Sequence, residues 1–408
     1  MRVLHTADWH LGQTLHDVDR HFEQEAFLCW LADVLLQEKV DVLLVCGDIF
    51  DSANPSAHAQ ALLYHFLALV ARQCPHLQVI LVAGNHDSAA RLEAPAPLLA
   101  GLSVRVVGAL PPFPWTPAQA AHFIIPLRSA SGRTAYCVAL PFLRPNDLPT
   151  PDAAGVAAVY QQAVAFANLQ RQPGDLLWLT GHLYLSGCAV SELSERRIFL
   201  GGAQAVACQD LPVADYIALG HLHRAQTVGG QAHIRYSGAP LPLAFGECNY
   251  AHQVVLVSWD EQGRTVTPVN VPLPVAWQRI GVPVAQDLSD TLKQLAALPL
   301  ATESTAATFP YLEVQVRLQE PVPDLRAQIQ AALQNKAVRL VKITPVYAAL
   351  SVEISPICEA LPTLNTLRPE EVLARCWAQQ FPGEVPVNLR EDFQTLWAQV
   401  MLEQEDKA

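Results

Sequence analysis

Short apolar runs recur along the first half of the chain, and most of them end in a small group of polar residues, often with a glycine. The clearest run covers 79–82 and leads directly into Gly84, Asn85 and His86. Short runs bounded by glycine are typical of strands buried in a mostly parallel sheet. The predicted strands cover 2–6, 42–46, 79–82, 136–140, 176–180 and 216–219, and apolar residues at helical spacing predict helices over 21–38, 56–72, 89–100 and 153–170. This alternation of strands and helices predicts an α/β domain.

A proline-rich stretch between 268 and 283 predicts a domain boundary. Before it, three strands over 234–236, 254–259 and 266–271 close the first domain in antiparallel fashion. After it come strands over 276–280, 311–318 and 338–344 and helices over 289–298 and 324–334. We therefore predict a main domain over 1–272, a small α/β domain over 273–345, a linker over 346–367 and a helical pair within 368–408.

The helix predicted over 56–72 is apolar almost all round. Such a helix is either buried inside its domain or shared with a second copy of the chain. We expect the second arrangement, a homodimer in which this helix and the one over 89–100 form a four-helix bundle across a two-fold axis. Burial within one domain remains the alternative, and Leu62 and Phe66 are the side chains that distinguish the two.

The two terminal helices, over 369–381 and 389–403, each carry one apolar stripe that contains a tryptophan, Trp377 or Trp397. Isolated helices of this length are marginal in water, so they need a surface to pack on. Aromatic anchors on short helices are typical of helix-in-groove contacts. We expect the pair to dock on a partner chain, and packing back on the small domain remains open.

The polar residues at the strand ends form one chemical set. Because strands of a parallel sheet end at the same edge, residues that are distant in sequence meet there. Two carboxylates, one amide oxygen and four imidazoles suit a pair of transition-metal ions such as manganese, iron or zinc, whereas Mg²⁺ or Ca²⁺ would require more oxygen. The set consists of Asp8, His10, Asp48, Asn85, His182, His221 and His223.

The net charge and the cysteine content indicate which partners and which cellular compartment fit a protein with such a site. The formal net charge is −12 at pH 7, which argues against a generic binder of polyanions through a basic surface. Nine cysteines are scattered without a C-x-x-C pair, a pattern typical of reduced thiols in the cytoplasm. The chain opens directly into a strand without a signal-peptide pattern, and we expect a cytoplasmic protein without a membrane span.

The strand-end motifs resemble the calcineurin-like metallophosphoesterase superfamily, whose pattern is D-x-H, G-D-x-x-D, G-N-H-D/E, G-H and G-H-x-H. All five blocks are present here, in that order. The resemblance implies a β-sandwich flanked by helices, with a small α/β capping domain and a C-terminal helical pair. It also implies that Asp8, His10 and His223 bind one metal, that Asn85, His182 and His221 bind the other, and that Asp48 bridges the two. His86 would act on the phosphate without binding metal, and Asp51 would orient His86.

Within the superfamily, the sequence is similar to bacterial nucleases that work with a separate ATPase chain. Ser52 stands where protein phosphatases of the superfamily carry arginine, and the stretches 215–226 and 235–245 fit the nucleases. No phosphate-binding G-x-x-x-x-G-K-[ST] loop occurs, so an ATP-driven step would need that second chain. The resemblance implies a manganese-dependent DNA exonuclease and endonuclease acting on DNA ends and hairpins in repair and recombination, with the terminal helices bound to the ATPase.

Two other functions remain possible from the sequence. One is a phosphodiesterase of cyclic nucleotides or other small molecules with the same metal site, which would have no need of the small domain or terminal helices. The other is a scaffold that holds DNA ends without chemistry. A scaffold would tolerate losses among the ligands and at His86, and this chain has lost none of them.

Overall fold

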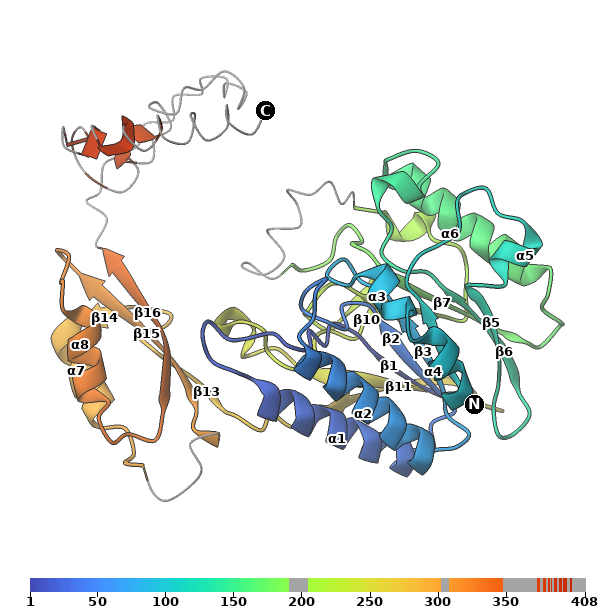
Figure 1. Cartoon of the computed structure of the whole chain (residues 1–408), viewed down its shortest axis with the longest axis horizontal. Coiled ribbons are helices and arrows are strands. Elements are labelled where there is room, and N and C mark those ends of the chain that lie inside the picture. The colour runs from blue at the N-terminus through green and yellow to red at the C-terminus, as the bar shows by residue number, and fades with distance from the viewer. Residues whose placement is uncertain are drawn as a thin grey trace.

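The computed structural model describes residues 1–190, 205–301, 308–347 and scattered positions between 373 and 397. Its larger part holds two six-stranded sheets with helices on their outer faces, and a smaller part holds a third sheet with two helices (Figure 1). The predicted α/β class with a β-sandwich and a small α/β unit is confirmed. The linker predicted over 346–367 lies outside the described residues except at 346–347, which form the end of a strand, and most of the terminal pair over 368–408 also lies outside them.

The first sheet carries three of the six strands predicted over residues 2–219. β1 to β4 run parallel, and β11 pairs antiparallel with β1 through partners such as Leu4 and Leu256. Its order is β12 (Gly263–Asn270), β11 (Gln253–Asp260), β1 (Arg2–Thr6), β2 (Val42–Cys46), β3 (Gln78–Val82) and β4 (Val104–Val107). The carboxyl ends of β1, β2 and β3 therefore lie side by side.

The second sheet faces the first across a shared apolar core that contains Trp178, Tyr216 and Trp259. Its central strands β6, β7, β8 and β10 are parallel, and β5 and β9 join antiparallel at the edges. Its order is β5 (Ile124–Arg128), β6 (Thr134–Ala139), β7 (Leu176–His182), β8 (Tyr216–Gly220), β10 (Gln231–Tyr236) and β9 (Gln226–Val228). The strands predicted from the sequence are thus divided between two sheets.

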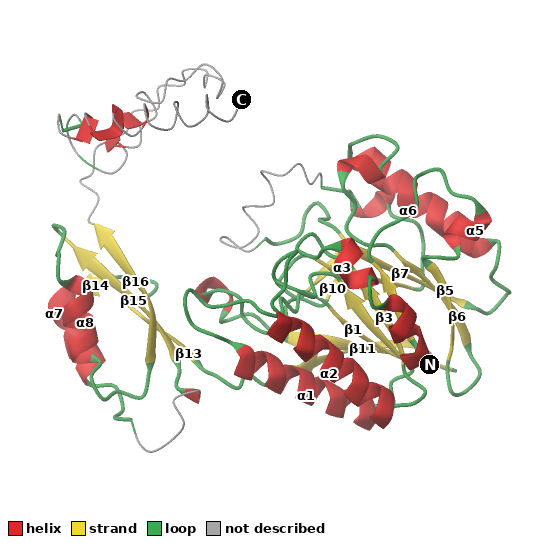
Figure 2. Cartoon of the chain, in the orientation of Figure 1, coloured by secondary structure: helices red, strands yellow, loops and turns green. Residues whose placement is uncertain are grey.

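Helices cover the outer faces of both sheets (Figure 2). α1 (His21–Gln37) and α2 (Ala57–Gln73) pack side by side and bury their apolar residues in a second core with the first sheet. α5 (Pro117–Ala120) and α6 (Ala153–Asn168) pack on the second sheet. None of the helices among the described residues is both long and apolar enough to cross a membrane.

The structure places the apolar side of α2 inside the domain, where a dimer interface was expected. Leu62 and Phe66, the residues expected at a dimer interface, are buried within the domain, where Phe66 makes an edge-to-face contact with Trp9 at 5.6 Å. His58 and His65 lie on the exposed side of the helix, together with small alanines. The near absence of a polar face therefore reflects small residues on the solvent side, and the burial alternative accounts for Leu62 and Phe66.

The helix predicted over 89–100 is two shorter helices, α3 (Ala89–Glu93) and α4 (Ala96–Leu99). Pro95 and Pro97 lack the N–H groups that a continuous helix would use, so the chain breaks there. A two-fold bundle built from one long helix over 89–100 is therefore wrong. A 3₁₀ turn (Ala100–Leu102) then leads into β4, a strand that the sequence pattern did not predict.

The third sheet forms the core of the small domain. Its central strand β15 (Tyr311–Leu318) pairs in parallel with all three others, and α7 and α8 pack on it through Leu295 and Ile329. The remaining elements are β13 (Trp277–Ile280), β14 (Gln286–Asp287), β16 (Arg339–Tyr347), α7 (Leu288–Ala296) and α8 (Leu325–Ala332).

A small cluster joins this domain to the larger one. Val275 and Tyr311 pack with Leu15 and Phe245 of the main domain. The Tyr311 hydroxyl also donates a hydrogen bond of 2.6 Å to Glu23 of α1. The small domain thus contacts the loop that follows β1.

Candidate metal centre

Four of the candidate ligands have strained backbone conformations at the ends of buried strands. Asp8 and His10 follow β1 with φ of 55° and 46°, Asp48 follows β2 with φ of 49°, and His221 follows β8 with φ of 102°. Non-glycine residues rarely adopt positive φ, and such strain concentrates at functional sites. Each unusual turn redirects a polar side chain to the shared edge of the two sheets.

Glycines allow these loops to approach one another closely. A Cβ at Gly84 would collide with the carboxylate of Asp48, and one at Gly47 would collide with the ring of His182. Gly47 also has φ of 90°, a value that favours glycine. Gly47 and Gly84, visible as turn signals in the sequence, are therefore needed to bring side chains from neighbouring strands into one site.

Asp48 lies at the centre of the candidate set. One of its oxygens, Oδ2, is 3.3 Å from Nε2 of His182 and 3.6 Å from Nε2 of His10. Its other oxygen, Oδ1, accepts a hydrogen bond of 2.9 Å from the backbone N–H of His86. This position between two groups of imidazoles is the one that a bridging carboxylate requires.

On one side of Asp48, three acceptor-capable atoms converge. The Oδ1 atom of Asn85 is 3.0 Å from Nε2 of His182 and 3.1 Å from Nδ1 of His221, and these two nitrogens are 3.3 Å apart. The Nδ1–H of His182 donates to the backbone oxygen of Cys46 at 2.9 Å, which directs its Nε2 lone pair toward this group. This donor set fits a transition-metal ion.

On the other side of Asp48, the donor atoms of Asp8, His10 and His223 all lie within 4.8 Å of one another. The Nε2 atom of His10 is buried and has no hydrogen-bond partner among the described residues. Asp8 also accepts hydrogen bonds of 3.0 and 3.2 Å from the backbone N–H of His221, which ties the two halves of the site together. An orphaned buried nitrogen facing a carboxylate and a second imidazole fits a second metal ion.

His86 lies beside this group but is held differently from the way we expected. Its Nδ1–H donates to the backbone carbonyl oxygen of Asp51 at 2.8 Å. The carboxylate of Asp51 instead lies 3.2 Å from Nδ1 of His10. The expectation that the Asp51 side chain orients His86 is therefore corrected, because the Asp51 backbone contacts His86 while its carboxylate contacts a candidate ligand.

Electrostatic coupling is strong across the centre. Burial alone would raise the pKa of Asp48, but the charge and hydrogen bond of His182, together with the charges of His10 and His86, outweigh burial and hold that pKa well below its usual range. Burial likewise opposes the charging of His182, yet the Asp48 carboxylate raises the pKa of His182 to about 9. Burial, together with repulsion from His182, lowers the pKa of His221 to about 3. A bound cation would replace the proton that this carboxylate favours on His182.

Two carboxylates that support the site were missed by the sequence reasoning. Glu247 is fully buried and lies 2.9 Å from Nδ1 of His223, the arrangement in which a carboxylate orients a metal-binding imidazole. Its position just past the family-like stretch 235–245 was the available signal. The second carboxylate, Asp87, accepts backbone hydrogen bonds of 2.8 to 3.1 Å from Gly84, Ile49 and Phe50, and so fixes the loops after β2 and β3.

Most of the chain is similar to known proteins of the phosphoesterase superfamily that its motifs resemble. Residues 1–225 match the family described as calcineurin-like phosphoesterase, and residues 278–381 match the type 5 capsule protein repressor C-terminal domain. The chain is 41% identical to the D subunit of nuclease SbcCD from Rhodobacter capsulatus, over 84% of this chain and 87% of that protein. It is 34% identical to the corresponding Escherichia coli protein over 84% of each chain, and 35% identical to that of Bacillus subtilis over 63% of this chain and 66% of that one. The chain therefore belongs to the family of SbcCD nuclease D subunits, within the calcineurin-like phosphoesterases.

Proposed function

We propose that this chain is a metal-dependent DNA nuclease that hydrolyses phosphodiester bonds together with an ATPase subunit of the SbcC kind. Membership of the SbcCD nuclease family supports this assignment. The observation that carries it is the gathering of two carboxylates, an amide and four imidazoles at one edge of two sheets, in contact distances that suit metal ions. No observation favours the small-molecule phosphodiesterase or the inert scaffold.

Two ions would be held by the side chains of the centre. Asp8, His10 and His223 would bind one ion, Asn85, His182 and His221 would bind the other, and Asp48 would bridge them. Bound there, a pair of divalent ions would supply an activated water near neutral pH and positive charge that offsets the charge on the phosphate oxygens. We propose Mn²⁺ as the metal, because a site rich in imidazole and poor in oxygen is unlike those of Mg²⁺.

His86 would act directly on the phosphate. Its Nδ1–H is committed to the Asp51 carbonyl, so Nε2 is the nitrogen that can exchange a proton or a hydrogen bond with a substrate. Nε2 in its protonated form would donate to a phosphoryl oxygen or to the departing sugar oxygen. Gly84 and the Asp48 contact to the His86 backbone hold the residue at the edge of the centre.

The wider assignment concerns the biological setting. We propose action on DNA ends and hairpins in repair and recombination, in the cytoplasm. The partner ATPase would bind the helices over 369–381 and 389–403. We retain the homodimer as a proposal, with an interface that does not use Leu62 and Phe66, because both are buried inside the domain.

The purified chain, with and without its partner ATPase, tests the assignment. Fluorescent linear and hairpin DNA would be incubated with Mn²⁺, Mg²⁺ or Zn²⁺, and bound metal would be counted by mass spectrometry. We expect two metal ions per chain, cutting that is greatest with Mn²⁺ and complete loss of cutting in excess EDTA. Undiminished cutting in EDTA would exclude the metal mechanism.

A further inference from the structure

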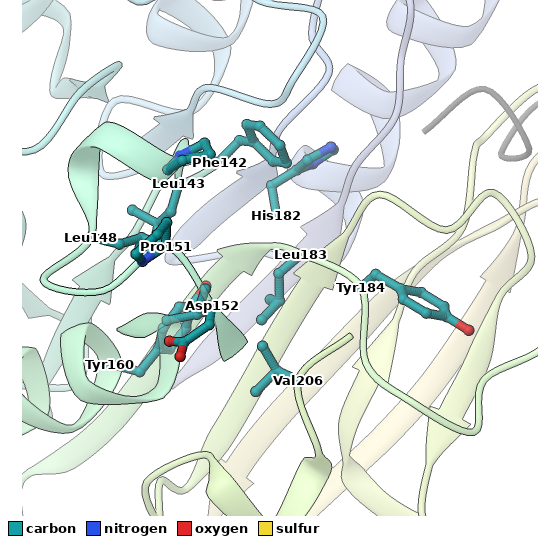
Figure 3. A pocket seen from close by; sticks show the side chains of 12 residues that line it. Phe142, Leu143, Leu148, Pro151, Asp152, Tyr160, His182, Leu183, Tyr184 and Val206 are labelled. Carbon is teal, nitrogen blue, oxygen red and sulfur yellow. The ribbon is translucent and has the colours of Figure 1, made fainter. Parts of the chain in front are cut away.

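An apolar pocket opens beside the metal centre and shares one wall with it. Figure 3 shows Leu143 and Leu148 on one side of this hollow and Leu183 and Val206 on the other, with His182 at its edge. His182 thus has one ring nitrogen in the candidate metal group while its side chain also lines the pocket. A molecule bound at the centre would extend naturally into this space.

Phe142 forms the partition between the pocket and the centre. Its ring stacks at 27° on the ring of His221, with centroids 6.4 Å apart, and meets His182 edge-on at 6.2 Å. Its backbone N–H donates to Ala83 at the end of β3, with a bond of 2.8 Å. The partition is therefore anchored to the strand that delivers Asn85 and His86, and its position relative to the ligands is fixed.

The pocket contains a polar group that none of the described residues satisfies. Tyr160 of α6 is buried, with 1% of its surface exposed, and its hydroxyl has no hydrogen-bond partner in the described part of the chain. The hydroxyl lies over Gly181, where a Cβ would collide with it. Burial raises the pKa of Tyr160, so the group is a neutral donor. A buried hydroxyl without a partner is costly, and a bound molecule could supply the missing acceptor.

The size of the pocket limits the occupant. The cavity measures about 50 Å³, and on that measure a water-sized group needs about 10–15 Å³. A closed cavity that binds one benzene ring measures about 150 Å³, so the enclosed part of this pocket takes only one edge of a flat ring and has no space for a base pair. Mostly apolar walls with a few polar groups, here Tyr160, Tyr184, His182 and the Asp152 carboxylate, are the usual form of a small-ligand site.

We propose that this pocket receives one unpaired nucleobase of the DNA strand whose phosphodiester lies at the metal centre. The ring would lie between the apolar walls formed by Leu148 and Leu183, and the Tyr160 hydroxyl would donate a hydrogen bond to a base carbonyl oxygen or ring nitrogen. Enzymes that do chemistry on a base hold it outside the stack in a pocket of this kind, where apolar side chains and hydrogen bonds contact it. The proposal rests on the nuclease function proposed above and adds a contact with one base to the contacts with the phosphate.

Two short oligomers with the same backbone test the proposal. One is a hexamer of thymidine, and the other is a hexamer of abasic tetrahydrofuran units, both fluorescently labelled. We expect the protein to cut the thymidine hexamer at least about tenfold faster, since the abasic units lack the apolar area that a base would bury in the pocket and a factor of ten corresponds to about 1.4 kcal/mol. Leu148→Trp, which fills the pocket, and Tyr160→Phe, which removes only the hydroxyl, should both reduce this ratio severalfold while leaving the abasic rate within about twofold.

Matched substitutions outside the pocket provide the controls. Leu169→Trp changes a leucine that is 79% exposed after α6, and Tyr136→Phe removes a hydroxyl that bonds to the Gln170 carbonyl. Both should leave the ratio unchanged. A wild-type ratio near one, or equal loss of both rates in the two pocket variants, would overturn the base pocket while leaving the nuclease in place. Failure of the wild type to cut either hexamer or any longer DNA would overturn the nuclease function itself.

Discussion

At the scale of single residues, substitutions at His86 and Asp48 should separate metal binding from chemistry. His86→Ala should keep both ions but lower the cutting rate by about 10²–10⁴-fold, because we propose that its Nε2, the nitrogen not bonded to the Asp51 carbonyl, acts on the phosphate. Asp48→Ala should lose bound metal as well as activity, because Asp48 lies between the two groups of imidazoles. Metal counting and nuclease assays on both variants check this. A metal-free His86→Ala protein would make His86 a ligand.

Glu247 should control the orientation of His223. Glu247→Gln replaces the carboxylate that lies 2.9 Å from Nδ1 of His223 with a neutral amide of the same shape. Loss of such a supporting carboxylate typically weakens metal binding by about 10–100-fold. Calorimetric titration with Mn²⁺ measures the effect. Glu93→Gln, which alters a carboxylate that bonds to Gly108, is the control and should leave Mn²⁺ affinity unchanged.

His5 should make the stability of the protein depend on pH. Burial, together with the charge of Arg235, lowers the pKa of His5 from its usual value of 6.5 to about 3. Its neutral ring accepts from Tyr216 and donates to the Leu219 carbonyl at 3.0 and 3.1 Å. Between the folded and unfolded pKa values only the unfolded chain binds the proton, so stability falls as the pH drops below 6.5.

A non-titrating replacement isolates this contribution. From pH 7.5 to 5, the wild type should lose about 2 kcal/mol of unfolding free energy that His5→Gln does not lose. Urea unfolding of both proteins at the two pH values measures the difference. Parallel losses in the two proteins would show that His5 is not the group responsible.

The residue scale also shows what the sequence could and could not predict about the site. The seven candidate ligands could be chosen because each follows an apolar run, and strand ends of parallel sheets meet at one edge. Glu247 could not be chosen in this way, because it reaches His223 from a short 3₁₀ turn (Phe245–Glu247) that has no periodic signal. The contact between the Asp51 backbone and His86 is invisible to any reasoning based on side-chain type.

At the scale of elements, α2 shows how composition can mislead. Alanines at the exposed or half-buried positions 57, 61 and 68 gave the helix its apolar character, although alanine is tolerated both inside and outside a domain. The strands and long helices were otherwise predictable because their periodicity extends over whole elements. β4 and β5 were missed because short edge strands carry few periodic positions, and prolines interrupted the helix over 89–100.

The burial of α2 leads to a prediction about Phe66. Phe66→Ala should lower the unfolding free energy by about 3–5 kcal/mol, because it leaves a cavity next to Trp9. Trp9 lies between Asp8 and His10, so the metal affinity of the folded variant should also fall. His65→Ala on the exposed side of the same helix should change stability by less than about 0.5 kcal/mol. Denaturant unfolding of the two variants checks both values, and equal effects would contradict the burial of Phe66.

At the scale of the whole molecule, a line of polar contacts runs from the small domain to the metal centre. Tyr311 donates to Glu23 at 2.6 Å, and Glu23 accepts from Arg20 at 2.9 Å. Arg20 in turn donates to the carbonyl of Pro242 at 2.7 Å. The next residue, Leu243, donates its backbone N–H to Glu247 at 2.9 Å, and Glu247 contacts His223.

Removing one hydroxyl tests whether this line holds the two domains together. Tyr311→Phe keeps the ring in its cluster with Leu15 and Phe245 but leaves Glu23 without that donor. Hydrogen bonds to charged groups contribute about 1.5–3 kcal/mol. Amide exchange in β13 should therefore become about tenfold faster or more, since a factor of ten corresponds to about 1.4 kcal/mol.

Arg317→Gln is the control, because it breaks only an exposed ion pair with Asp287 inside the small domain and should leave amide exchange in β13 unchanged. If both variants exchange alike in β13, the domains are held by the apolar cluster alone, and the small domain is not connected to His223 through Glu23 and Arg20.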